Sequence, residues 1–62
     1  MNTRYYLRFT FVDTASEAQH LVNVHNAYAT PYIRKNRPAH YTPWESLDGK
    51  EKKFVVYYYD HN

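Results

Sequence analysis

The segment from residue 5 to residue 11 alternates apolar and polar positions. This period of two is typical of a β-strand that has one side in a core. We therefore predict a first strand whose more apolar side faces the interior of the domain. The residues assigned to that interior side are Tyr5, Leu7, Phe9 and Phe11.

A helical period follows, and it ends before Pro31. Thr14 and Glu17 match the capping box, in which a hydroxyl and a carboxylate three residues apart satisfy free backbone N–H groups at a helix start. Thr30 and Pro31 then favour a short second helix through residues 32–35, with Thr30 as its cap. At about 100° per residue, one apolar stripe forms on the main helix. Its members are Ala18, Leu21, Val22, His25, Tyr28 and Ala29.

Two strand-like runs, residues 40–46 and 52–59, flank the only glycine of the chain, Gly49. Because Asp48 precedes it, the pair suits the two central positions of a type I′ turn, both of which need positive φ. The turn predicts a hairpin that sets Thr42 opposite Val55. Pro43 cannot donate a ladder hydrogen bond, which places the first arm at an edge and the second arm in the middle.

These elements predict an α+β fold over residues 1–62, a single domain with β-α-β-β order. The sheet is expected to be three-stranded and antiparallel, with strand order 1-3-2 and one main helix on one face. One helix covers only one side of such a sheet, so the other side is left as a candidate binding surface. The residues predicted to bind a partner there are Tyr6, Arg8, Trp44, Lys53, Val55, Tyr57 and Tyr59.

The composition indicates how such a surface is used. The chain has 62 residues with eight Tyr, three Phe, one Trp and no cysteine. A domain of this size buries only about 60% of its unfolded surface, and without disulfides it relies on aromatic packing or self-association. We therefore predict a non-enzymatic binding or assembly module that forms a homodimer or binds another protein. The alternative is that this side of the sheet binds nothing and is half-solvated, with the apolar parts of its own Tyr and Lys side chains covering one another.

Charge supports a second alternative. Eight Lys or Arg residues against six Asp or Glu give a formal charge of +2, too small to indicate a nucleic-acid protein by itself. However, planar side chains flanked by cations are what single-stranded nucleic acid requires. The residues expected to serve in that case are Arg4, Arg8, Arg34, Lys35, Arg37 and Lys53.

Catalytic and metal chemistry find little support in the sequence. His20 and His25 are five residues apart, so on a helix they point in different directions and cannot share a metal. We predict no metal, no cofactor and no enzymatic activity. Metal-free RNA cleavage by Arg8, His40 and Tyr57 stays a further alternative, without diagnostic spacing. His25 is expected to be a core imidazole bonded to a Tyr hydroxyl or a backbone carbonyl.

The chain has no apolar run long enough to cross a membrane, and its first residues do not resemble a signal peptide. The absence of cysteine favours a reducing compartment for so small a domain. We therefore predict a soluble, cytoplasmic protein without membrane partners.

Overall fold

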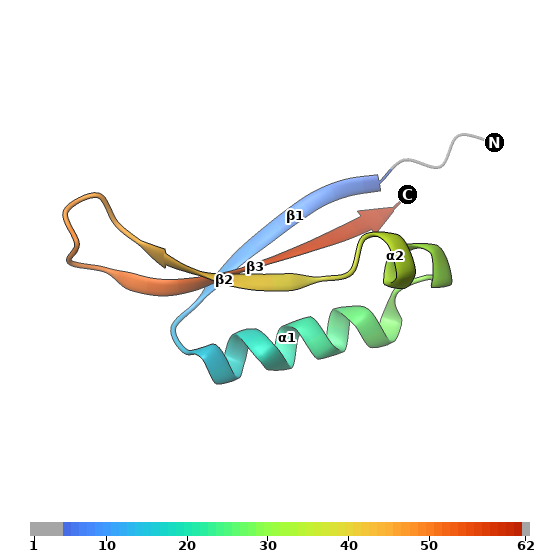
Figure 1. The fold of residues 1–62 in the computed structure, drawn as a ribbon, viewed down its shortest axis with the longest axis horizontal. Helices are drawn as coiled ribbons and strands as arrows, with labels where there is room; N and C mark the ends of the chain where they lie inside the picture. Colours follow the sequence, from blue (N-terminus) through green and yellow to red (C-terminus); the bar gives the residue numbers. More distant parts are fainter. Residues whose placement is uncertain (1–4, 62) are drawn as a thin grey trace.

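The computed structural model describes residues 5–61, and it has the predicted α+β fold. The order of elements is β1 (Tyr5–Val12), α1 (Ala15–Tyr28), α2 (Pro31–Asn36), β2 (His40–Glu45) and β3 (Lys52–His61). Figure 1 shows α1 as one layer beneath the sheet, with the β2–β3 loop at one end of the molecule and α2 at the other. The shape is elongated, with extents of 45 × 21 × 15 Å.

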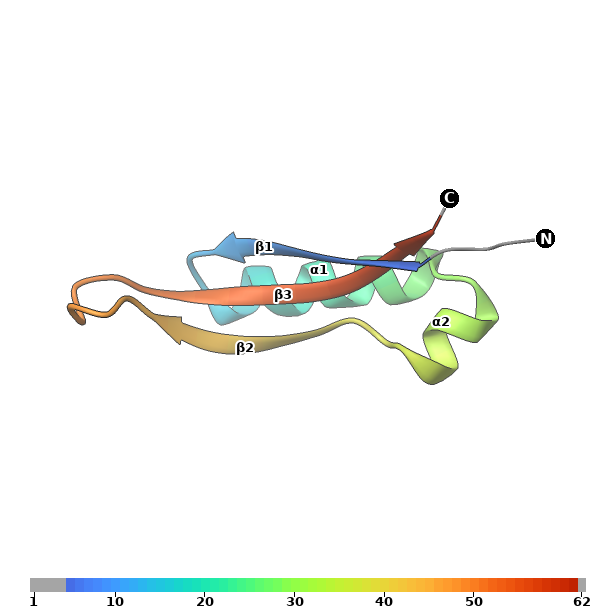
Figure 2. The same cartoon turned by 90° about the horizontal axis from the view of Figure 1, so that it is seen from above.

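The sheet has the predicted order β1-β3-β2, and both neighbouring pairs are antiparallel. Figure 2 shows β3 between the other two strands. Thr42 lies opposite Val55, as the hairpin prediction required, and Pro43 lies on the edge strand β2. Along β1 the pairing sets Phe9 opposite Tyr57 and Thr10 opposite Val56. Because paired residues point to the same side of a sheet, these pairs fix the two faces.

The hairpin loop has the predicted register, but the predicted turn type is wrong. Gly49 has a φ of +72°, whereas no other described residue has positive φ, so Asp48 cannot occupy a type I′ position. The Gly49 N–H instead bonds to the Ser46 carbonyl at 2.9 Å, and the Ser46 N–H bonds to the Glu51 carbonyl at 2.9 Å. These bonds close a four-residue loop from Leu47 to Lys50, a length commonly built around a β-turn whose central residues have negative φ.

The start of α1 confirms the hydroxyl half of the predicted capping box, whereas the Glu17 carboxylate accepts from the Thr14 hydroxyl at 3.3 Å and not from a backbone N–H. The Thr14 hydroxyl accepts a hydrogen bond from the Glu17 N–H at 3.1 Å. Ala18 and Val22 are buried against the sheet. The predicted stripe is wrong at its C-terminal end, because Tyr28 is 88% exposed. The C-terminal half of α1 meets the sheet through His25, which contacts Tyr58, and not through Tyr28.

The short helix α2 is confirmed, with Thr30 as N-cap and Pro31 in the first turn. The Arg34 guanidinium reaches back to α1 and donates to the carbonyls of Asn26, Ala27 and Ala29 at 2.9–3.2 Å. These carbonyls lie at the C-terminal end of α1 and lack helical partners, so a cation there both satisfies them and complements the helix dipole. Arg34 thus joins the two helices.

The buried core consists of small side chains. The buried apolar residues among those described are all Ala, Val or Ile, and Val56 at the centre of β3 is the largest that is fully buried. Aromatic rings pack around this core without being buried in it. The buried set is Ala18, Val22, Ile33, Ala39, Val55 and Val56.

Candidate functional site

The face of the sheet turned away from α1 is called the open face here. The opposite face carries Val12, Phe54 and Val56, which pack with Ala18 and Val22 of the helix. The cross-strand pairs then place the alternate residues of each strand on the open face. Its members are Tyr5, Leu7, Phe9 and Phe11 of β1, His40, Thr42 and Trp44 of β2, and Lys53, Val55, Tyr57 and Tyr59 of β3.

The prediction for β1 is therefore wrong, because its two sides are exchanged. Tyr6 and Arg8, predicted on the open face, lie on the helix side opposite Asp60 and Tyr58. Arg8 pairs there with Asp60 at 3.3 Å. The side with Leu7, Phe9 and Phe11, predicted to be the core, is the side that α1 does not cover. This exchange adds the most apolar stripe of the chain to the open face.

A link of two residues explains this orientation. Only Asp13 and Thr14 separate β1 from α1, and the last strand residue, Val12, packs against the core cluster under the helix. Side chains alternate along a strand, so a helix-facing Val12 turns Phe11 and Phe9 outward. The position of Val12 beside this short link was the sequence signal that could have revealed the true faces.

The large apolar side chains of the open face are in solvent. Leu7 is 54% exposed, Phe9 60%, Phe11 43% and Trp44 36%. If each side chain has about 200 Å² of surface, these four leave on the order of 400 Å² of apolar area uncovered. Contiguous patches of this size on a small protein often mark interaction sites.

The rings of the open face contact one another across all three strands. The Phe11 and Trp44 ring centroids are 5.0 Å apart, and those of Phe9 and Phe11 are 5.9 Å apart. Tyr57 lies 6.4 Å from Phe9 on one side and stacks on His40 at 5.2 Å on the other. The central Val55 is only 3% exposed, so it supports this layer and offers no surface of its own.

Two cations lie at opposite ends of the open face. At the hairpin end, the Lys53 ammonium is 3.1 Å from the Asp13 carboxylate, which raises the pKa of Lys53. At the α2 end, the Arg37 guanidinium lies 5.0 Å from the Tyr59 ring centroid. Hydrogen bonding to Tyr32 and then to Tyr59 raises the pKa of Arg37. Both cations are therefore held in defined positions.

The residues expected to bind nucleic acid are not gathered on one surface. Arg34 caps α1, and Arg8 lies on the helix side in its pair with Asp60. Lys35 is exposed on α2, and Arg4 lies outside the described residues. Of the predicted set, Lys53 lies on the open face and Arg37 lies against its edge. The open face therefore brings together two of the predicted cations, Lys53 and Arg37.

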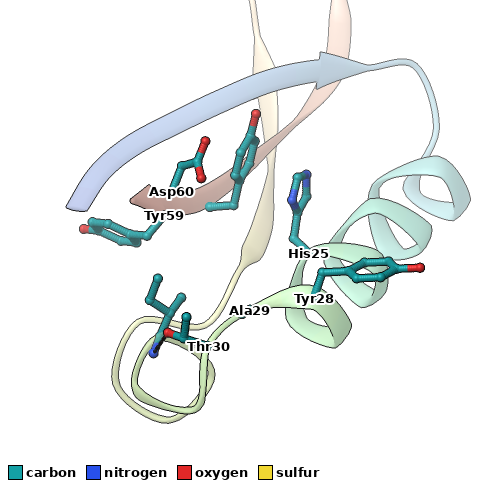
Figure 3. Close-up of a pocket in the computed structure, with 8 residues that line it drawn as sticks. His25, Tyr28, Ala29, Thr30, Tyr59 and Asp60 are labelled. Atoms are coloured by element: carbon teal, nitrogen blue, oxygen red, sulfur yellow. Dashed lines mark hydrogen bonds between the residues drawn. The ribbon is translucent and has the colours of Figure 1, made fainter. Parts of the chain in front are cut away.

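A concave region separate from the open face lies between α1, α2 and the end of β3 (Figure 3). It has a volume of about 280 Å³ and lies on the helix side of the sheet. His25 stacks on Tyr58 there, with ring centroids 3.7 Å apart and an interplanar angle of 10°. The contact that holds this imidazole is thus a ring stack. Figure 3 shows Tyr59 and Asp60 on β3 across this region from Thr30 at the start of α2.

The three residues considered for RNA cleavage do not lie on one side of the sheet. Arg8 lies on the helix side, whereas His40 and Tyr57 lie on the open face, so these three cannot act on one substrate. Among the side chains that the structure describes, residues 5–60, no three His, Asp or Glu groups converge as metal ligands. Within the same range, no helix has both the length and the apolar character needed to span a bilayer.

No protein-family model, curated protein or solved structure matches this chain.

Proposed function

We propose that this protein is a non-enzymatic assembly module in which two copies pack their open faces against each other. The observation that carries the proposal is the orientation of β1. Leu7, Phe9 and Phe11 point away from α1, while Arg8 and Thr10 point toward it. A strand with its apolar side outward is stable in water when a second layer covers that side.

A second copy of the chain fits the chemistry of this surface. The exposed centre is aromatic and aliphatic, and the two cations at its ends already contact groups of the same chain. The cations lie at the two ends of the surface, and the centre between them is apolar. Its best complement is another flat apolar face, and a sheet packed on a sheet is a common form of such contact.

The available area agrees with a small two-fold interface. Leu7, Phe9, Phe11 and Trp44 from two copies bring together on the order of 800 Å² of apolar surface. At about 25 cal/mol per Å² this area gives an upper estimate of about 20 kcal/mol, from which an association cost of about 4–15 kcal/mol and the ordering of interface side chains are subtracted. The half-buried Tyr57 and its neighbours add further area toward the roughly 1,200 Å² of stable interfaces. The lack of cysteine agrees with a cytoplasmic setting for this assembly.

Light scattering behind a sizing column tests the proposal. The wild-type chain is expected at twice its 7.5 kDa mass at micromolar concentration, with dissociation on dilution. Leu7→Lys, which adds a charge to the open face, is expected to give a monomer. Tyr28→Lys is the matched control, because Tyr28 is 88% exposed on α1 and lies outside the open face. A wild-type chain that remains monomeric throughout the concentration series refutes the proposal.

A further inference from the structure

The net charge differs in sign between the two ends of this elongated molecule, which is 45 Å long. The hairpin end holds five carboxylates against three lysines, a net charge of −2. Its members are Asp13, Glu17, Glu45, Asp48 and Glu51, with Lys50, Lys52 and Lys53.

The α2 end has the opposite sign. Arg34, Lys35 and Arg37 lie within or directly after α2, and Arg8 and Asp60 neutralise each other in their ion pair. The described part of this end therefore carries a net charge of +3. Figure 1 shows α2 and the hairpin loop at opposite ends of the long axis. The separation is a property of the fold, because β3 carries the chain from the acidic end back to the basic end.

The charges next to the open face follow the same pattern. Glu51 lines a hollow with Phe11, Trp44 and Lys53 at the hairpin end of the face. Glu51 is the carboxylate that lines this hollow, and its charge adds to the larger effect of Asp13 in raising the pKa of Lys53. At the other end, the Arg37 guanidinium lies against Tyr59.

Two copies that pack face to face about a two-fold axis have two limiting arrangements. If the axis runs along the strands, like ends meet, and both the acidic and the basic ends repel. If the axis runs across the strands, each acidic end lies over the partner's basic end. We infer that the second copy packs in this antiparallel arrangement, with the hairpin loop of one copy beside α2 of the other. The inference rests on the proposed function and specifies its geometry.

The exposed hairpin loop supports a contact at this position. Leu47 is 109% exposed at the tip of a loop that projects beyond α1 in Figure 1. The loop is held by internal hydrogen bonds, since the Asp48 carboxylate accepts from the Ser46 hydroxyl at 2.6 Å and from the Lys50 N–H at 3.0 Å. In the antiparallel dimer this tip reaches the partner's α2, where Tyr32 is 50% exposed.

Spin-label distances test the geometry directly, because the chain has no cysteine that would add a second label. Leu47→Cys places a label at the exposed tip, and Lys35→Cys places one on exposed α2. Either variant alone is expected to give a label separation near the 45 Å molecular length. A one-to-one mixture of the two variants is expected to add a separation of about 20 Å or less, because packed sheets lie about 10 Å apart.

Each other outcome overturns the geometry. A short distance in the Leu47→Cys sample alone shows that like ends meet. If a dimer forms and its mixed sample lacks the short distance, the two copies do not pack face to face in the antiparallel arrangement. Side-by-side pairing of the β1 edges is one arrangement that would give this result. A chain that is monomeric by light scattering refutes the proposed function itself, which is a separate result.

A charge exchange provides an independent readout in solution. Arg37→Glu and Glu51→Arg are each expected to weaken dimerisation about fivefold to tenfold, and the double variant is expected to restore it. Restoration occurs only when residue 37 of one copy faces residue 51 of the other. Weakening in the double variant equal to the product of the single effects contradicts the antiparallel arrangement.

Discussion

The phenylalanine at the centre of the outward side of β1 provides the most discriminating test of the dimer. Phe9 contacts Phe11 and Tyr57 on the open face and is 60% exposed. In an isolated chain the substitution Phe9→Ala removes a side chain that is mostly in water. In a dimer packed through the open face it removes a side chain from the middle of the interface, so the two states respond differently.

The magnitude follows from the exposed area. With a side chain of about 200 Å², Phe9 offers about 120 Å² to a partner, of which truncation to alanine removes about 100 Å². At about 25 cal/mol per Å² the loss is about 2.5 kcal/mol for each copy. A two-fold interface loses this amount twice, about 5 kcal/mol, so the dissociation constant rises by about three to four powers of ten. The free energy of unfolding of the monomer changes by less than about 1 kcal/mol.

Sedimentation equilibrium over a concentration series measures the dissociation constant of wild type and variant. Urea unfolding at a concentration where both proteins are monomeric measures the free energy of unfolding of the monomer. Tyr28→Ala serves as control, since Tyr28 is an exposed ring on α1. If Phe9→Ala and Tyr28→Ala leave dimerisation equally unchanged, the open face is not the interface. If Phe9→Ala instead unfolds the monomer, Phe9 is part of the core and its assigned exposure is wrong.

Three further predictions concern the fold that supports this face. Arg34→Ala is expected to lower the free energy of unfolding by about 1 kcal/mol because it frees the last carbonyls of α1, whereas Lys35→Ala changes it by less than about 0.5 kcal/mol; equal effects in urea titrations would contradict the capping role. Val56→Ala is expected to cost about 2–3 kcal/mol, since it leaves a cavity under α1, and a cost below about 1 kcal/mol would show that the site is not close-packed. Hydrogen bonding from the Ser46 hydroxyl lowers the pKa of Asp48. The ionised carboxylate therefore stabilises the fold fully above the ordinary Asp pKa of about 4, and this stabilisation is lost as the pH falls through the lowered pKa. Melting curves between pH 6 and pH 2 should show a smaller decline in melting temperature for Asp48→Asn than for wild type, and identical declines would refute this assignment.

Most of the fold could be predicted from local signals. The Thr14 capping box and the Thr30 and Pro31 pair act over three or four residues, so the starts of α1 and α2 follow from the sequence. Gly49 likewise predicted the hairpin register, although the loop around it has a different turn type. Pro43 on an edge strand then led to the observed strand order.

The candidate site was predicted only in part, because local signals reach the hairpin but not β1. Trp44, Tyr57 and Tyr59 belong to the hairpin, whose register sets their common face, and the structure places all three on the open face. Tyr6 and Arg8 belong to β1, which has no local link to the hairpin. The period of two identifies two sides of β1, but it does not state which side meets a helix.

The sequence by itself determined the elements, their caps and the hairpin register, because neighbouring residues in the chain specify these features, and Pro43 indicated the order of the strands by marking an edge. The tertiary structure decided which side of β1 is covered. Packing of Val12 beside the core under α1 turned Leu7, Phe9 and Phe11 outward. A shift of one residue along a strand exchanges its two faces at no local cost, so only long-range packing selects between them. The apolar surface proposed to bind a second copy results from that choice.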